Sequence, residues 1–499
     1  MSNSYAELQS KFGGKFRETT LRDTDYKNKK VYWLEFYGAT CPICGHKSWC
    51  MVNVTGTKVI CQRVPNEHKL DSINGYLYYL DKNAKVNFNI DKYQERTTYK
   101  KTDDNTLDLF YRAILLAYPL DKKHRQDLYK RGMTDEMIDL HGGRGFGTYY
   151  QFTKESLNNG IPHPYFTQEK YALDGEKLII NNVWNNMLKN LRESTNNSYY
   201  SKDLWHGVPG FSLQEITVKN RSYFSPIFKG PVDGLLVPYY NELNQLVGFQ
   251  SRVDHVSTWT TITKDLPVEE TEVYLNSKTR QYTIYRKISE DDRTKIATGV
   301  AKGNIVDIKV PDWQGNPQPY QFKIEEGGKY FWVSSSKEDG GASGRVPIEV
   351  AYNPEIAKLD PSDPVQKQKI QDYIKKPKSI WLTEGGLKGL ITASYLPKHF
   401  SNEDLDKFGR DVLAVAGVNS YRHFLPMLKK LNVKTVTTAY DMDFQHNEQV
   451  FDNYKSLIRM LRENGFKVRV ANWNGDEAKG IDDALVKNLE INFQEQEAK

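Results

Sequence analysis

Three carboxylates near the C-terminus have the spacing of a magnesium site. Glu384 follows the apolar run SIWLT (379–383), and Asp441 and Asp443 follow the run TVTTAY (435–440). Because the carboxyl ends of parallel strands share one edge of a sheet, the three acids are expected to converge there. Converging carboxylates repel one another unless a cation neutralises them, and Mg²⁺ or Mn²⁺ accepts such oxygen ligands. The alternatives are a solvated DxD loop and a Glu that faces a helix dipole.

All four cysteines lie in one short segment with the spacing of a zinc site. Cys41 and Cys44 form a CxxC turn, which lets two thiolates bind one face of a tetrahedral ion. Residues 50–61 alternate like a hairpin with a two-residue turn, and that register places Cys50 directly opposite Cys61, with Cβ atoms about 5 Å apart. We expect a closed, four-thiolate structural zinc site. The alternatives are free thiols and a disulfide between Cys50 and Cys61.

The carboxylates lie in a segment with the pattern of a parallel α/β sheet. From about residue 376, short apolar runs alternate with helical periods, which is typical of parallel strands covered by helices. One helix is clear, because an apolar stripe at helical spacing runs from Val450 to Leu461 and Gly465 ends it. The four expected strands are 379–383, 412–417, 435–440 and 466–472.

Helical and then strand patterns precede this segment. Residues 106–145 are expected to be helical, with an N-cap at Thr134. Residues 146–225 are expected to be irregular, with some helix near 180–193. The expected strand segments are 234–254 with a turn at Glu242 to Gln245, a β-rich insertion at 255–325, and 329–336.

The composition indicates a soluble protein with a polyanionic partner. The 499 residues are 38% hydrophobic and carry a net charge of +6. The sequence has no apolar run of about 18 residues and no signal-peptide pattern, so we expect no membrane contact and a cytoplasmic location with reduced thiols. It also has no GxxxxGK[ST] motif, so a motor would have to belong to another chain.

The motifs around the acids resemble the Toprim domain, which bacterial primases, topoisomerases and some nucleases share. The matching segments are EGGLKGL (384–390), the Gly417 turn, AYDMD (439–443) and KGIDD (479–483). The resemblance implies that Glu384, Asp441 and Asp443 bind the catalytic metal. Asp482 and Asp483 either add outer-shell ligands or cap a helix.

Lys388 is a departure from the pattern of bacterial replicative primases. Those proteins commonly have an acid four residues after the Glu, where this chain has Lys388. A lysine at this position resembles phage and plasmid primase-like proteins. We expect Lys388 to contact nucleotide or template.

Upstream segments are similar to the RNA-polymerase core of bacterial primases, at residues 234–252 and 329–336. By that likeness Arg252 and Lys329 face nucleotide or template phosphate, whereas a surface salt bridge is the alternative for each. The expected fold is multidomain α/β. Its expected parts are a β zinc ribbon region (1–75), a helical and irregular linker region (76–225), an α+β primase-like core (226–375) carrying the 255–325 insertion, and a Toprim parallel sheet (376–490).

This order of parts implies a DNA primase that makes short primers on single-stranded DNA in the replication of a mobile element. The ribbon would hold the template, and Trp49 either stacks on a base or packs in the hairpin core. The expected partners are single-stranded DNA template, nucleoside triphosphates, a replicative helicase on a separate chain and a single-strand-binding protein. The alternatives are a metal-dependent Toprim nuclease, which needs the same acids, and a non-catalytic zinc-and-Toprim DNA-binding protein.

Overall fold

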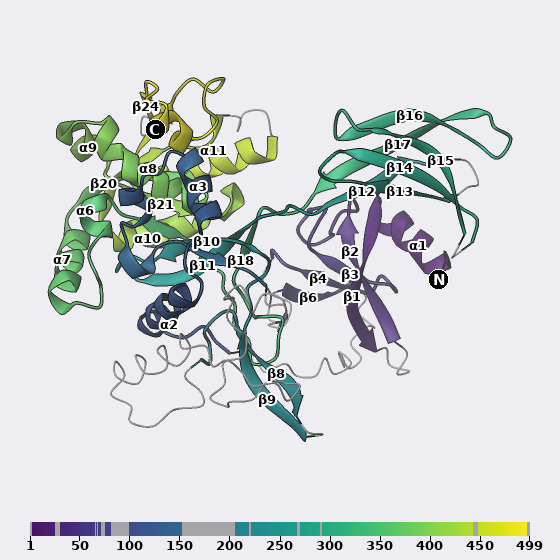
Figure 1. Cartoon of the computed structure of the whole chain (residues 1–499), viewed down its shortest axis with the longest axis horizontal. Helices are drawn as coiled ribbons and strands as arrows, with labels where there is room; N and C mark the ends of the chain where they lie inside the picture. The colour runs from purple at the N-terminus through teal and green to yellow at the C-terminus, as the bar shows by residue number, and fades with distance from the viewer. Residues whose placement is uncertain are drawn as a thin grey trace. The chain divides into compact units, whose positions relative to one another are not determined.

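The chain forms two compact units, Met1–Arg96 and Thr97–Lys499 (Figure 1). The fold is α/β with several parts: an N-terminal antiparallel sheet, antiparallel sheets in the middle, and a mostly parallel C-terminal sheet covered by helices. The computed structural model describes residues 2–24, 30–64, 66, 68–70, 75–80, 99–151, 205–218, 221–266, 270–289, 292–442 and 448–496.

The first unit is one antiparallel sheet with a short helix, and its strand order is β1-β2-β3-β4-β6-β5. Its buried core includes Leu8, Phe36 and Val52. The elements are α1 (Ser2–Phe12), β1 (Lys15–Thr24), β2 (Lys30–Tyr37), β3 (Met51–Asn53), β4 (Lys58–Cys61), β5 (Lys69–Leu70) and β6 (Gly75–Tyr79).

The hairpin of β3 and β4 has the register that the cysteine spacing predicts. Val52 pairs with Val59, so that Cys50 and Cys61 face one another one step beyond the ladder. The prediction of a tight two-residue turn is wrong, however. The Asn53 side chain accepts hydrogen bonds from two main-chain amides across the loop, at 2.9 Å each, and closes a longer connection in place of main-chain pairing.

The helical segment at the start of the second unit agrees with the prediction. Asp103 caps its first helix by accepting from two main-chain amides, and Thr134 caps a short later helix as expected, accepting from the Met137 amide at 3.4 Å. The apolar face of the first helix is buried in the main core. The elements are α2 (Asp104–Ala117), α3 (Lys122–Lys130), α4 (Asp135–Ile138) and the 3₁₀ turn η3 (Gly142–Arg144).

A four-stranded antiparallel sheet follows, in the order β18-β11-β10-β7. The expected strand–turn–strand at 234–254 and the strand near 330 are confirmed as β10 (Gly234–Tyr240), β11 (Leu246–Val253) and β18 (Tyr330–Trp332). The expectation of irregular structure at 146–225 is wrong for β7 (Gly147–Tyr149) and for the hairpin of β8 (Phe211–Val218) and β9 (Arg221–Phe228). That hairpin is anchored at its base, where Phe211 and Phe228 are buried. The helix expected near 180–193 lies outside the described residues.

The predicted β-rich insertion is confirmed as two three-stranded antiparallel sheets. They share a small apolar core of their own, which includes Tyr282, Ile284 and Phe322. The strands are β12 (Thr258–Lys264), β13 (Thr271–Leu275), β14 (Gln281–Lys287), β15 (Arg293–Val300), β16 (Ile305–Pro311) and β17 (Pro317–Glu326).

The C-terminal sheet has the order β19-β21-β20-β22-β23-β24. The four predicted strands are confirmed as parallel neighbours, and antiparallel strands that the sequence did not reveal add to both edges. The strands are β19 (Glu349–Ala351), β20 (Lys378–Glu384), β21 (Asp411–Val415), β22 (Val433–Thr438), β23 (Lys467–Asn472) and β24 (Asn492–Gln496).

Helices cover both faces of this sheet (Figure 1). The cores on the two faces are distinct. Helices α8 and α9 pack on the face shared with the four-stranded sheet β18-β11-β10-β7, called the middle sheet below, and α10 and α11 pack on the other face. The helix predicted around 450–461 is confirmed as α11. The helices are α6 (Pro354–Ala357), α7 (Pro364–Lys375), α8 (Gly386–His399), α9 (Asn402–Phe408), the 3₁₀ turn η5 (Val418–His423), α10 (Phe424–Lys430), α11 (Glu448–Glu463) and α12 (Ile481–Val486).

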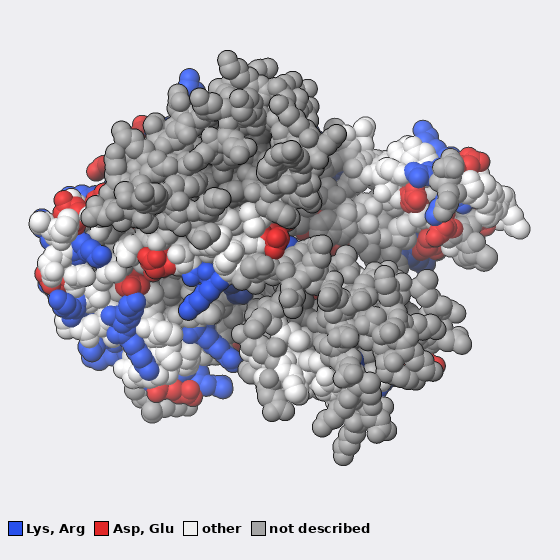
Figure 2. All heavy atoms as spheres, turned by 90° about the horizontal axis from the view of Figure 1, so that it is seen from below, with Lys and Arg blue, Asp and Glu red and all other residues white. Residues whose placement is uncertain are grey.

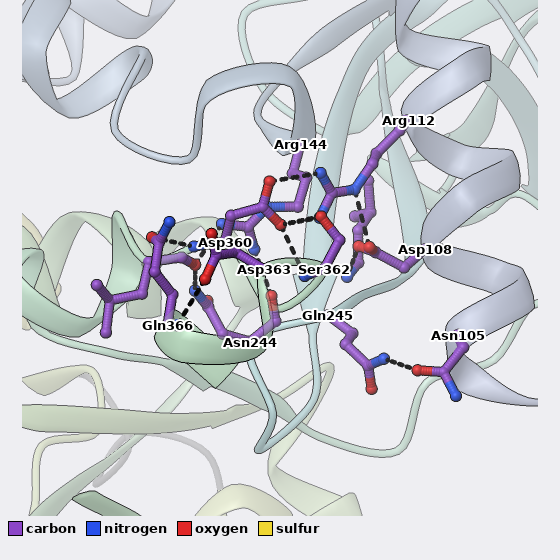
Figure 3. A network of polar contacts seen from close by, with 12 residues as sticks. Asn105, Asp108, Arg112, Arg144, Asn244, Gln245, Asp360, Ser362, Asp363 and Gln366 are labelled. Atoms are coloured by element: carbon purple, nitrogen blue, oxygen red, sulfur yellow. Dashed lines mark hydrogen bonds and ion pairs between the residues drawn. The ribbon is translucent and has the colours of Figure 1, made fainter. Parts of the chain in front are cut away.

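A network of buried and partly buried charges joins α2 to the turn between β10 and β11 and to the segment before α7 (Figure 3). Arg112 pairs with Asp108 at 2.8 Å and with Asp360 at 2.7 Å. Arg144 is fully buried and donates to the main-chain oxygen of Asn244. Because each buried charge has a hydrogen-bonded partner, the network fixes the helical segment against the sheets. No helix among the described residues is long and apolar enough to cross a membrane.

Candidate functional site

Glu384 and Asp441 follow neighbouring parallel strands, as the sequence predicts. Glu384 is the last residue of β20, and Asp441 follows β22 closely. The ladder pairs Leu382 with Thr438, and the Ala439 amide donates to the Leu382 carbonyl at 2.8 Å. Both acids therefore lie at the same edge of the sheet. Asp443 lies outside the described residues.

Two glycines after Glu384 turn the chain from β20 into α8. Gly385 has φ of +89°, a left-handed conformation that glycine adopts without strain. Gly386 packs against the ring of Tyr239 from β10, and a Cβ there would lie 2.6 Å from the ring. The Gly386 amide also donates to the Tyr239 hydroxyl at 3.3 Å. The EGG motif thus ends β20 at Glu384 and packs the start of α8 against Tyr239 of the middle sheet.

Asp441 lies between two lysines. Lys388, in the first turn of α8, pairs with one of its carboxylate oxygens, and Lys479 approaches the other at 3.7 Å. The side chains of Lys388 and Asp441 are 16% and 26% exposed, so this pair is screened less than a surface pair. The charge of Asp441 is therefore balanced within the protein itself.

Asp482 forms a second charge pair at the same edge. It is 2% exposed and accepts from Arg131 at 2.6 Å. The N-cap of α12 is Gly480, so the alternative that Asp482 or Asp483 caps this helix is wrong. Burial, followed by the charge of Asp482, raises the pKa of Asp483 above its usual value.

The predicted basic residues lie on the middle sheet. Gln250 accepts from the Tyr239 hydroxyl at 2.8 Å, and Arg252, two residues further along β11, shares its face of the sheet. Arg252 therefore lies on the face that meets the Glu384 turn. Lys329 is exposed, and its carbonyl accepts from Val253 at 3.0 Å. Strand alternation assigns Lys329 to the opposite face from Arg252.

Two buried polar atoms near the acids have no hydrogen-bond partner among the described residues, the Tyr440 hydroxyl and Oδ1 of Asp482. Burial, with the negative charge of Glu384 nearby, raises the pKa of Tyr440 well above its usual range. Orphaned polar atoms beside two carboxylates suit a hydrated cation, which supplies water and charge together. Glu384 and Asp441 are the described residues that could hold it.

The four cysteines converge as predicted, and within the described residues they form the one cluster with metal-ligand spacing. Their sulfur atoms all lie within 4.8 Å of one another, with Cys44 and Cys50 at 3.6 Å and Cys50 and Cys61 at 3.8 Å. Tetrahedral Zn–S bonds of about 2.3 Å give sulfur separations of about 3.8 Å. The cluster is consistent with structural zinc. All four thiols are free, so the disulfide alternative is not supported.

The electrostatics of the cluster also call for a cation. A hydrogen bond from Cys50 lowers the pKa of Cys41 to about 5, whereas burial raises the pKa of Cys61. One thiolate thus suppresses ionisation of its neighbours unless a metal balances them. The guanidinium of Arg63 lies 3.6 Å from the Cys50 sulfur, and the Val64 amide donates to Cys61 at 3.4 Å. Such outer contacts stabilise metal-bound thiolates.

Trp49 does not pack in the hairpin core. It is 66% exposed and has φ of +71°, which is uncommon for a bulky residue. Its amide donates to Glu35 at 3.0 Å, and Glu35 also pairs with Arg17. The core alternative for Trp49 is therefore wrong, and the indole is available for contacts outside the unit.

Sequence reasoning missed Arg131 and Tyr239. Arg131 lies 351 residues before its partner Asp482 in the chain, and no local pattern links the two. Tyr239 is one of many tyrosines. Its role is visible only through its contact with Gly386, for which the paired glycines of the EGG motif were an indirect signal.

Comparison with known proteins gives two findings. Residues 371–491, which include the C-terminal sheet from β20 to β23, match the model of a domain of unknown function (DUF3854). The chain has a distant structural match to the zinc-binding and RNA polymerase domains of the Aquifex aeolicus primase, with a TM-score of 0.32 and 11% identity, covering 98% of this chain and 84% of that one. A likeness at this level supports no statement about individual residues. No curated protein matches the chain.

Proposed function

We propose that the chain is a DNA primase that joins nucleotides on single-stranded DNA at the edge bearing Glu384 and Asp441. The observation that carries the proposal is that these acids follow adjacent parallel strands at one edge of the sheet. Lys388 pairs with Asp441 there, and Arg131 pairs with Asp482. Phosphoryl chemistry needs both parts: carboxylates that hold a divalent ion, and basic groups that bind phosphate oxygens. The Toprim-like motifs support the same assignment.

The reaction would break one bond and form one. The 3′-hydroxyl of the primer attacks the α-phosphorus of the incoming triphosphate, the bond to the β-phosphate oxygen breaks, and pyrophosphate leaves. Mg²⁺ or Mn²⁺ held by Glu384, Asp441 and Asp443 would neutralise charge on the triphosphate. Glu384 is a ligand or the acceptor of the hydroxyl proton. Lys388 and Arg252 would contact phosphate oxygens through charge-assisted hydrogen bonds.

Lys329, Asp482 and Asp483 have more distant roles in this proposal. Strand alternation turns Lys329 away from Arg252, so its contact would be with template that runs past the edge of the sheet. Asp482 is held by Arg131 and would orient the outer shell of the site. Asp483 lies beside Asp482 and would do the same.

The first unit would hold the template. Its zinc site would be structural, and the exposed Trp49 offers a ring on which a base can stack. On the second unit, Lys and Arg side chains gather at the left of Figure 2, the side on which Figure 1 shows α6, α7 and α10. Such basic surfaces attract the phosphate backbone. The helicase, and any single-strand-binding protein, would be separate chains.

A non-catalytic DNA-binding role is the second candidate. It is favoured by one observation, that lysines already balance the charge of Asp441 without any metal. A nuclease would use the same acids to hydrolyse phosphodiester bonds.

Paired isosteric variants test the proposal. Glu384→Gln and Asp441→Asn keep shape and remove charge, so each should abolish template-dependent nucleotide incorporation while zinc content and circular dichroism stay as in the unaltered chain. Glu403→Gln, on the exposed surface of α9, is the matched control and should retain activity. Incorporation that persists in the Glu384→Gln protein would refute the assignment, and binding of DNA without incorporation by the unaltered chain would favour the non-catalytic role.

A further inference from the structure

A lysine ammonium is built into the carboxylate edge. Lys388 lies in the first turn of α8, four residues after Glu384, and its side chain is 16% exposed and pairs with Asp441. An exposed lysine samples many rotamers, whereas this one is held by Asp441 in the segment that follows β22. Its positive charge is therefore a fixed feature of the site.

Packing around the tip of Lys388 maintains this arrangement. Gly480 lies directly against it: a Cβ at residue 480 would lie 3.1 Å from the Lys388 nitrogen and 2.5 Å from Oδ1 of Asp482. The ammonium and this carboxylate oxygen thus both lie close to Gly480. Oδ1 of Asp482 has no hydrogen-bond partner within the described part of the chain, while its Oδ2 binds Arg131. The ammonium of Lys388 is therefore paired with Asp441 and has the Asp482 carboxylate as a near neighbour beyond ion-pair distance.

The position that Lys388 occupies on Asp441 is where a further divalent ion would otherwise bind. Two-metal sites hold their ions about 3.5–4 Å apart on bridging carboxylates. A second divalent ion that shared Asp441 with the first would compete with the ammonium of Lys388 for this carboxylate. Like charges so close exclude one another where solvent screening is weak.

We propose that Lys388 takes the place of a second divalent ion, so that the site binds one Mg²⁺ or Mn²⁺ per chain. This inference rests on the proposed function, because it concerns the metal at the same acids. Lys388 is then a positioning residue for Asp441 as well as a fixed positive charge toward phosphate. Arg131 and Lys388 together balance the charges of Asp482 and Asp441.

Counting bound Mn²⁺ tests the inference without any activity assay. Zinc-loaded full-length protein is titrated with Mn²⁺, and free Mn²⁺ is followed by electron paramagnetic resonance. We expect one Mn²⁺ per chain for the unaltered protein and two for Lys388→Glu, which adds a carboxylate where the ammonium was. Lys388→Gln removes only the charge and should tighten binding of the single ion by roughly tenfold.

Lys479→Gln is the matched control, because Lys479 is 61% exposed and its nitrogen lies 3.7 Å from Asp441. It should leave the count at one. Two ions on the unaltered chain, or one ion on a folded Lys388→Glu protein, would overturn the inference. If Lys388→Glu does not fold, unchanged Mn²⁺ affinity in Lys388→Gln would overturn it. Absence of Mn²⁺ binding to the unaltered chain, or binding that survives in Glu384→Gln, would instead refute the metal site of the proposed function.

Discussion

At the scale of single residues, the candidate site depends on charge pairs that span the chain. Asp482 is buried and Arg131 is its hydrogen-bonded partner from a different segment. Removing one partner of a buried pair leaves the other charge desolvated. The sequence could nominate Asp482 from its motif, but the partner could not be predicted, because the two residues are brought together only by the tertiary fold.

We expect Arg131→Ala to destabilise the second unit by about 2–3 kcal/mol, less than for a fully buried pair because Arg131 is partly exposed. In the Asp482→Asn background, Arg131→Ala should lower the free energy of unfolding by less, because no buried carboxylate charge is left without its partner. Urea unfolding of the four proteins measures this coupling. Lys130→Ala, which removes an exposed pair with Asp127, is the control and should change stability by about 0.5 kcal/mol or less. Additive effects of Arg131→Ala and Asp482→Asn would contradict the pairing.

Glu349 is a second residue whose charge the fold controls. It is fully buried on β19, one carboxylate oxygen accepts from the Tyr240 amide at 2.8 Å, and the other has no partner in the described residues. Burial raises the pKa of Glu349 well above its usual value. The folded chain therefore keeps a proton there that the unfolded chain loses as pH rises.

This proton stabilises the folded chain fully at a pH below the pKa of Glu349 in the unfolded chain. The stabilisation is lost as the pH rises toward the higher pKa of Glu349 in the folded chain. Between pH 5 and pH 8 the free energy of unfolding should fall by up to about 1.4 kcal/mol per pH unit from this group alone. Glu349→Gln cannot titrate, so its urea midpoint should fall less over the same range and exceed that of the unaltered chain at pH 8. Parallel pH profiles for the two proteins would show that Glu349 is not the cause.

At the scale of elements, periodic strands were predictable and their edge partners were not. Strands β20 to β23 consist largely of apolar and β-branched residues, so they could be recognised locally. Strand β19 has three residues and pairs antiparallel with β21, which lies some sixty residues later, and β24 pairs antiparallel with β23 across the segment that contains α12. In the hairpin of β3 and β4, the alternation of residues predicted the register correctly. The turn that closes this hairpin could not be predicted, because it depends on the Asn53 side chain.

The turn between β20 and α8 gives a test at this scale. Gly386→Ala would place a methyl group 2.6 Å from the Tyr239 ring, so we expect a loss of about 1–3 kcal/mol from overpacking and a displaced Glu384. Gly143→Ala is the control, because a Cβ there meets nothing within 4 Å. Thermal unfolding and Mn²⁺ affinity measure the two effects. Adding Tyr239→Leu to Gly386→Ala should recover much of the stability. Equal behaviour of the Gly386 and Gly143 variants would argue against the close contact.

At the scale of the whole molecule, the two units have different sources of stability. The first unit has a small core that includes the cysteine cluster, whereas the second has extensive apolar cores on both faces of its C-terminal sheet. Small domains commonly need a metal to fold, and larger cores do not. The composition could indicate several domains, but it could not locate the boundary near residue 96.

Removal of zinc should therefore affect one unit selectively. A strong chelator is expected to release one zinc per chain and to make residues before Arg96 sensitive to protease, while a fragment that begins near Thr97 stays resistant. Atomic absorption counts the zinc, and limited proteolysis with mass spectrometry identifies the fragments. Cys41→Ser should reproduce the effect without chelator. A metal-free chain whose first unit remains resistant would rule out a structural role for zinc.

The direction of phosphodiester chemistry is the central question for the Glu384 and Asp441 edge. The most direct measurement incubates the full-length chain with circular single-stranded DNA, labelled nucleoside triphosphates and Mg²⁺ or Mn²⁺, and separates the products on a denaturing gel. We expect new labelled oligomers that require the DNA, the metal and the Glu384 carboxylate. No labelled oligomers, with the circular DNA cut into shorter fragments or left intact, would contradict this expectation.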